Sequence, residues 1–103
     1  MITIVEINEA IQKQLDEDIQ AKLFDSEVRD LIAFWIMEIK EVGYDEYIRS
    51  PLAKSFGDHA LHGKRQGERA ISLNPVGGRL IYKRLKNRVV VKVIKITPDH
   101  DYK

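Results

Sequence analysis

The spacing of apolar residues changes along this chain, from a helical repeat in its first half to an alternation typical of strands near its end. The first stripe recurs every four positions, at Ile11, Leu15, Ile19 and Leu23. It predicts an amphipathic helix with Asn8 as its N-cap. A broader apolar face predicts a second helix between Ser26, its expected cap, and Gly43, its expected stop. We expect Trp35, in the middle of that face, to anchor the core.

Strand patterns flank these helices. Residues 2–7 are short and β-branched, and further strands are predicted at residues 70–73, 79–85 and 89–96. Residues 86–88 leave room only for a tight turn, so the last two strands should form an antiparallel hairpin. Residues 44–56 are less regular, with a short turn of helix expected at Pro51 after Ser50. Residues 59–62 are expected to form a loop.

These elements predict an α+β fold in the order β-α-α-β-β-β. The N-terminal strand and two helices should pack on one face of a small, twisted, largely antiparallel sheet. With 103 residues and no internal repeat or linker, the chain is expected to be a single domain spanning residues 1–103.

Composition narrows the classes of function. The chain has no cysteine, which excludes disulfides, zinc–thiolate sites and thiol catalysis. Its start is apolar but lacks the basic lead of a signal peptide, and no stretch approaches the roughly 20 apolar residues of a membrane helix. We therefore expect a cytoplasmic protein without a membrane partner.

Charge is distributed unevenly although the net charge is only +1. Residues 1–50 contain five Lys or Arg and twelve Asp or Glu, a net charge of −7, whereas residues 51–103 contain twelve and four, a net charge of +8. Such asymmetry is typical of a surface for nucleic acid or an acidic partner. The alternative is that the two halves attract each other, or that strands place these cations on a solvated face.

Few residues could carry chemistry. There is no phosphate-binding glycine loop and no nucleophile motif, and His59 and His62 lack a third ligand, so no metal or cofactor is expected. What remains is a set of cations and a tail with acid/base side chains, which are Lys64, Arg65, Arg69, Arg79, His100 and Tyr102. Arg69 and Arg79 flank one predicted hairpin and could face the same groove.

Three segments together resemble a known family. They are Gly63-Lys64-Arg65-Gln66-Gly67-Glu68-Arg69-Ala70-Ile71-Ser72-Leu73-Asn74, Gly78-Arg79-Leu80-Ile81-Tyr82 and His100-Asp101-Tyr102. This set resembles toxins of type II toxin–antitoxin modules, in the RelE/ParE superfamily that includes RelE-, YoeB-, YafQ- and HigB-like members. The match is best over residues 59–103, and the early strand and helices are consistent with it.

The resemblance implies a ribosome-dependent mRNA endonuclease that a cognate antitoxin holds inactive. Arg79 matches the arginine that neutralises the scissile phosphate, and His100 and Tyr102 match C-terminal acid/base positions. The expected RNA contacts are Lys64, Arg65, Arg69, Lys83 and Lys103. Cleavage without metal uses the 2′-hydroxyl of the RNA as nucleophile, so the protein needs a phosphate clamp and acid/base groups.

The sequence also departs from the family pattern. Ala70 and Ser72 stand where the RelE branch has catalytic lysines, and Gly78 stands where a bulky residue often precedes the arginine. This favours a YoeB- or HigB-like site that relies on Arg79 and the tail. Glu68 is expected to form an ion pair with Arg65 or Arg69. The alternatives are a ParE-like poison of DNA gyrase and an inactive binding module of the same fold.

Overall fold

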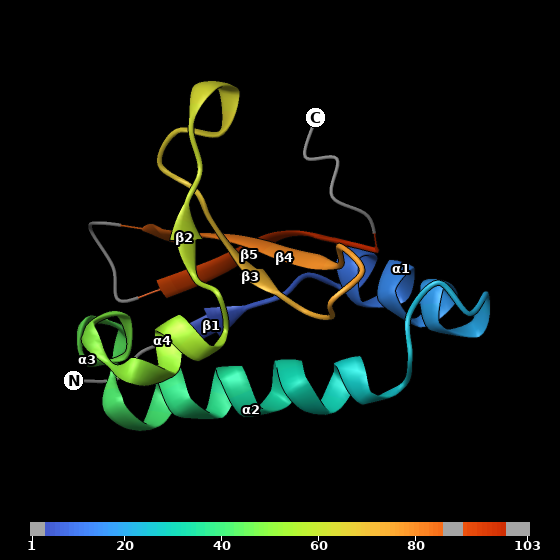
Figure 1. Ribbon diagram of the computed structural model, residues 1–103, viewed down its shortest axis with the longest axis horizontal. Helices are drawn as coiled ribbons and strands as arrows, with labels where there is room; N and C mark the ends of the chain where they lie inside the picture. Colours follow the sequence, from blue (N-terminus) through green and yellow to red (C-terminus); the bar gives the residue numbers. More distant parts are fainter. Residues whose placement is uncertain (1–3, 86–89, 99–103) are drawn as a thin grey trace.

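A computed structural model describes residues 4–85 and 90–98 of the chain (Figure 1). The helices are α1 (Glu9–Gln20), α2 (Glu27–Val42), α3 (Tyr44–Arg49) and α4 (Pro51–Ser55), with a 3₁₀ turn, η1, at Gly63–Arg65. The strands are β1 (Ile4–Glu6), β2 (His59–Ala60), β3 (Arg69–Ser72), β4 (Arg79–Leu85) and β5 (Val90–Thr97). They form one sheet in the order β1-β5-β4-β3-β2, in which β1 runs parallel to β5 and the other pairs are antiparallel.

The predicted α+β architecture is confirmed, with helices gathered on one face of the sheet. The main core joins residues of all four helices to alternate residues of β3, β4 and β5, and α2 runs along beneath the sheet in Figure 1. Trp35 is fully buried there, as predicted, and its indole nitrogen donates to the Tyr47 hydroxyl at 2.9 Å. We call the opposite side of the sheet the outer face.

Most helix boundaries agree with the sequence signals. The Asn8 side chain accepts a hydrogen bond from the Ile11 amide at 2.9 Å, which confirms it as the N-cap of α1. Gly43 ends α2 with a φ of 86°, a conformation that favours glycine. Ser26 and Ser50 stand at the predicted N-cap positions of α2 and α4, but neither side chain makes a capping hydrogen bond. The Ser50 hydroxyl instead donates to the Tyr47 carbonyl at 2.6 Å.

Two elements differ from the predicted order. Residues 44–49 form α3 rather than an irregular segment, because Tyr44 and Tyr47 are buried against the core. The segment expected to be a loop contains β2, which pairs with β3 and forms the edge of the sheet. The predicted tight turn at residues 86–88 lies outside the described residues, but the antiparallel pairing of β4 with β5 is confirmed.

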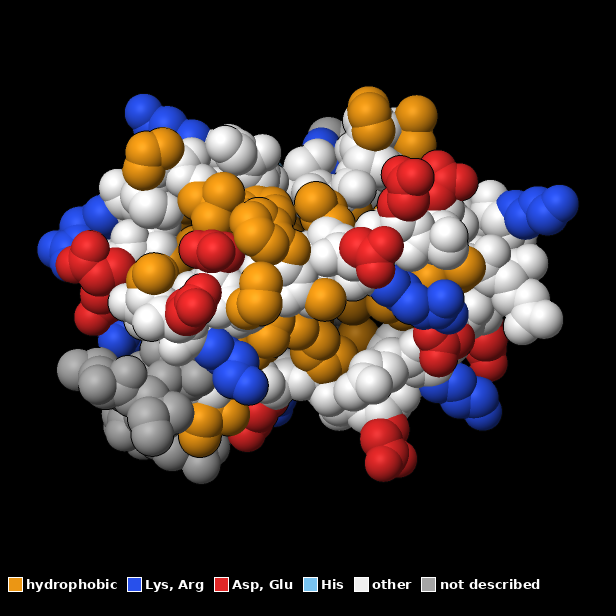
Figure 2. Space-filling view, turned by 90° about the horizontal axis from the view of Figure 1, so that it is seen from below, with side chains coloured by type: hydrophobic (Ala, Val, Ile, Leu, Met, Phe, Trp, Pro, Cys, Tyr) orange, Lys and Arg blue, Asp and Glu red, His pale blue; other side chains and the backbone are white. Residues whose placement is uncertain are grey.

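The side formed by α1 and α2 is apolar and acidic. Figure 2 shows hydrophobic side chains gathered in the middle of this side. Phe34 and Met37 of α2 are 42% and 54% exposed. A hollow of about 420 Å³ lies between β1, α1 and α2. The two helices contain eight Asp or Glu and three Lys or Arg. None of the helices within residues 4–85 and 90–98 is long and apolar enough to cross a membrane.

Candidate functional site

Cations gather on the outer face of the sheet. Leu80 and Tyr82 of β4 point into the core, so Arg79 and Lys83 point the other way. On β5, Lys92 pairs with Lys83 and Lys95 pairs with Ile81, which puts both lysines on the same face. Like charges directly opposite each other destabilise a sheet. A face that keeps such a pair is suited to a polyanion.

Little acidic charge offsets these cations. Among the strand residues that the structure describes, Glu6 is the one acid, and it lies beside Lys92 in register. Lys92 is exposed, whereas Arg79, Lys83 and Lys95 are partly exposed. The cations of this face therefore lie largely without ion-pair partners in the described sheet, in contrast to the paired cations on the helix side.

The turn before β4 fixes Arg79. The Asn74 side-chain oxygen accepts from the amides of Val76 and Gly78, at 3.2 and 2.8 Å, which closes the turn. A Cβ on Gly78 would lie 2.6 Å from the Phe24 ring, so the bulky residue common in the family does not fit here. The turn therefore delivers Arg79 to the start of β4 in one orientation.

The Arg79 guanidinium is only partly satisfied. One terminal nitrogen donates to the Gly78 carbonyl at 2.8 Å and to the Ser72 hydroxyl at 3.3 Å. Its Nε is buried and has no hydrogen-bond partner within the described chain. An unsatisfied buried donor costs about 1–3 kcal/mol, so the Arg79 side chain is not held by a complete set of hydrogen bonds within the described chain. Ser72, which replaces a family lysine, supports Arg79 instead, and Ala70 is fully buried.

His59 was not among the site residues predicted from the sequence, but it lies on the outer face. It pairs with Ala70 in register, while its neighbour Ala60 pairs with Arg69 on the helix side, so His59 lies on the outer face two strands from Arg79. Its Nδ1 lies 2.9 Å from the Gly57 carbonyl oxygen. A carbonyl only accepts, so Nδ1 carries a proton in this contact and Nε2 points away from it.

Arg69 does not share a groove with Arg79, and that expectation is wrong. Arg69 pairs with Tyr82 in register and Arg79 pairs with Ser72. Residues three apart on a strand point to opposite faces, so Arg69 lies on the helix side. There its Nε donates to Asp58 at 2.7 Å, and the Asp58 side chain is fully buried.

Asp58 is the centre of a buried polar cluster that we call the inner network. Its Oδ2 accepts from the hydroxyls of Tyr47 and Tyr82, at 2.8 and 2.7 Å, and the Tyr44 hydroxyl lies 3.0 Å from that of Tyr82. Burial raises the pKa of both Tyr47 and Tyr82 above the ordinary value, and the Asp58 charge raises it further. Both hydroxyls therefore remain protonated donors to the carboxylate.

The inner network also acts on Arg69. Burial alone would lower the pKa of Arg69, but the hydrogen bond and charge of Asp58 outweigh it and raise the pKa. The guanidinium stays charged beside a charged carboxylate, and three donors satisfy that carboxylate. Neither Asp58 nor this role of Arg69 was predicted, because an isolated Asp before a histidine gives no pattern that indicates burial.

The other predicted site residues divide into two groups. Lys64 and Arg65 lie in η1, between β2 and β3, and Arg65 forms the predicted ion pair with Glu68 at 2.8 Å. His100, Tyr102 and Lys103 lie outside the described residues. Within residues 4–85 and 90–98, no three His, Asp or Glu side chains come together as possible metal ligands.

Comparison with solved structures shows that the fold is RelE-like. One match is YafQ from E. coli strain BL21(DE3), with a TM-score of 0.61, 18% identity, and 91% of this chain and 90% of that chain covered. Another is the YoeB/ParE toxin from Agrobacterium tumefaciens, with a TM-score of 0.60, 15% identity, and 93% and 96% covered. HP0892, a conserved hypothetical protein from Helicobacter pylori, matches with a TM-score of 0.56, 21% identity, and 97% and 96% covered.

These likenesses confirm the predicted fold, and at identities of 15–21% they concern the fold alone. No protein-family model matches the sequence. No curated protein matches it either. The activity must therefore be argued from the residues of this chain.

Proposed function

We propose that this protein is the toxin of a type II toxin–antitoxin system, and that it cleaves mRNA on the ribosome without a metal. The observation that carries the proposal is the outer face, where Arg79, Lys83, Lys92 and Lys95 gather with His59 and with little acidic charge. A cationic sheet face with an imidazole suits RNA, whose phosphates it can hold and whose 2′-hydroxyl it can deprotonate.

The chemistry needs three contributions. The 2′-oxygen attacks the adjacent phosphorus while a base takes the 2′ proton. The bond to the 5′-oxygen breaks as an acid protonates that oxygen, leaving a 2′,3′-cyclic phosphate and a free 5′-hydroxyl. Arg79 neutralises the extra charge on the phosphate oxygens, a contribution of roughly 3–4 kcal/mol for one preorganised donor.

Histidines and a tyrosine supply the acid and base. In the proposal His100 and Tyr102 act there, and His59 adds a second imidazole to the same face. Thr97 pairs with Arg79 in register, so β5 ends beside the phosphate clamp. Lys64, Arg65, Lys83 and Lys103 are proposed RNA contacts, with Lys92 and Lys95 now added.

The partners follow from the same proposal. The ribosome presents the mRNA, a cognate antitoxin blocks the toxin, and both place the protein in the cytoplasm. DNA lacks the 2′-hydroxyl and should not be cut by this route.

Primer extension on translated mRNA after induction tests the proposal. We expect new 5′ ends for the wild type, and their loss in Arg79→Ala and His100→Ala. Arg49→Ala, which removes an exposed cation of α3, is the matched control and should cleave normally. Absence of new ends in the wild type would refute the nuclease, and a loss of DNA supercoiling in its place would indicate a gyrase poison. Ends that persist in both variants would reject the site.

A further inference from the structure

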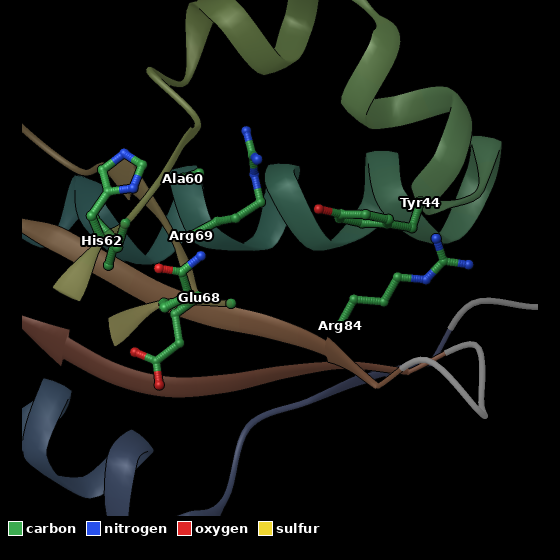
Figure 3. A pocket seen from close by; sticks show the side chains of 9 residues that line it. Tyr44, Ala60, His62, Glu68, Arg69 and Arg84 are labelled. Carbon is green, nitrogen blue, oxygen red and sulfur yellow. The ribbon is translucent and has the colours of Figure 1, made fainter. Parts of the chain in front are cut away.

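A second recessed site lies on the helix side of the sheet, at the edge formed by β2. We call it the edge pocket: a cavity of about 510 Å³ lined by residues that include Tyr44, Ala60, Leu61, His62, Arg69 and Arg84 (Figure 3). Its size is that of an ordinary ligand site. Because Arg69 and Arg79 point to opposite faces, the edge pocket is separate from the outer face.

Arg69 offers two unused donors in this pocket. Its Nε is held by Asp58, which the buried hydroxyls of Tyr47 and Tyr82 fix in turn. No residue in the described part of the chain bonds its two terminal nitrogens. Figure 3 shows the Arg69 side chain extended between His62 and Tyr44. A guanidinium held by its Nε presents a preformed pair of N–H groups, which matches two oxygens of one planar anion.

The charges around the edge pocket distinguish it from an RNA site. Asp58 pairs with Arg69, Asp45 pairs with Arg84, and Glu68 pairs with Arg65. Each of these arginines has its own carboxylate, so the pocket lacks the excess of positive charge that binds a polyanion. Recognition here depends on the direction of hydrogen bonds, which suits a single carboxylate.

The edge strand gives the ligand a backbone to pair with. The Leu61 amide donates to the Glu68 carbonyl at 2.9 Å, across the same register that pairs Ala60 with Arg69. Backbone groups alternate along an antiparallel strand, so the N–H and C=O of Ala60 point away from β3, toward the open edge. β2 pairs only with β3 among the described strands. An extended peptide could add to this edge.

We propose that the edge pocket binds an extended acidic segment of a partner polypeptide. The segment pairs its backbone with Ala60 and places one Asp or Glu carboxylate on the terminal nitrogens of Arg69. Its apolar neighbour points to the opposite face and lies against Leu61. The inference rests on the proposed function only in taking that partner to be the antitoxin. It assigns Arg69 to the regulator rather than to the RNA.

A peptide titration followed by ¹⁵N NMR tests the inference on the intact chain. The probe is acetyl-Val-Glu-Val-amide, and acetyl-Val-Gln-Val-amide is its matched control. We expect saturable shifts of the Ala60 amide and the Arg69 Nε–H on addition of the Glu peptide. The Gln peptide should bind about tenfold more weakly, because its side chain lacks the charge. Absence of saturable shifts, or equal binding of both peptides, would overturn the inference.

Two further measurements separate the contacts and the partner classes. N-methylation of the Glu residue of the probe removes a backbone donor without changing the protein, and should weaken binding. Arg69→Lys should lose the preference for Glu, and Lys83→Gln on the outer face should keep it. A 2′-O-methyl RNA that shifts the Ala60 and Arg69 signals in place of the peptide would overturn the inference and assign the pocket to RNA.

This outcome is independent of the nuclease proposal, because the titration contains no mRNA or ribosome. Peptide binding by a chain that produces no new 5′ ends would support the edge pocket and count against the nuclease. Cleavage by a chain that binds neither peptide would support the nuclease and refute the edge pocket.

Discussion

Arg69 and Arg79 each stand first in a strand, in neighbouring strands of one sheet, yet they lie in opposite environments. Arg69 points to the helix side, where a fully buried carboxylate holds its Nε. Arg79 points to the outer face, where a hydroxyl and a carbonyl hold one terminal nitrogen and its Nε has no partner in the described chain. The fold fixes the Nε of Arg69 with a buried carboxylate and leaves the Nε of Arg79 without a partner in the described chain. We infer that the first stabilises the protein and the second serves its reaction.

The sharpest test of that contrast is Asp58→Asn. Removing the charge leaves the Arg69 guanidinium, whose side chain is 31% exposed, without its counter-ion. Breaking a fully buried pair costs about 3–5 kcal/mol, so this half-buried pair should cost no more than the lower end of that range. Urea denaturation should show this loss in the free energy of unfolding. Asp16→Asn removes the exposed ion pair with Arg29 and should cost less than about 1 kcal/mol. Equal stability of the two variants would show that the inner network contributes little.

Arg79→Gln should instead reduce cleavage and leave the free energy of unfolding nearly unchanged. We expect mRNA cleavage to fall about 10²–10³-fold, because a preorganised donor to the phosphate is lost, with the free energy of unfolding within about 1 kcal/mol of wild type. Arg69→Gln, the matched variant, should lose stability first. We would measure cleavage rates on translated mRNA and urea midpoints on the same preparations of both variants. These two measurements separate a loss of activity from a loss of stability. Comparable loss of stability in Arg79→Gln and Arg69→Gln would show that the two arginines do not differ in their contribution to stability.

The inner network also predicts how stability depends on pH. Tyr47 and Tyr82 have a pKa raised by burial and by Asp58, so the unfolded chain releases these protons at a lower pH than the folded one. Their contribution is complete below about pH 10 and is lost as the pH rises further, by up to roughly 1.4 kcal/mol per pH unit for each tyrosine. Urea denaturation between about pH 9 and 11 measures the slope, which Tyr82→Phe should reduce. An unchanged slope in that variant would contradict the assignment.

The smallest expected effect concerns the outer face. Lys92→Glu replaces a like-charge pair with Lys83 by an opposite-charge pair but creates a like-charge pair with Glu6, so the free energy of unfolding should change by less than about 1 kcal/mol at low salt. The same change should weaken binding of a non-cleavable RNA and reduce its dependence on salt. Lys54→Glu, on α4, is the control and should leave RNA binding unchanged. A folded Lys92→Glu variant that binds RNA as well as wild type would exclude Lys92 from the contact surface.

Long patterns were predictable from the sequence and short ones were not. The repeat through α1 and α2 spans several turns, so periodicity alone identified both helices. α3 has six residues and β2 has two, too few for any period to show, and contacts made by Tyr44, Tyr47 and β3 hold them.

The site was predicted only in part for a related reason. The cations were visible in the sequence, but their faces depend on the register between β3 and β4, which the Asn74 turn sets. A shift of one residue would have exchanged the faces of one strand. Asp58 and His59 stand side by side in the sequence and serve opposite sides of the sheet. Only the pairing of β2 separates them.

The parallel pairing of β1 with β5 joins residues from opposite ends of the chain. Contacts so distant in sequence form late during folding, because closing a long loop lowers the entropy of the chain before the strand contacts can offset that loss. During synthesis, β1 has no strand to pair with until β5 has been made. The outer-face lysines of β5 therefore enter the sheet only after β1 to β4 have been made, and the cationic face is incomplete until β5 pairs.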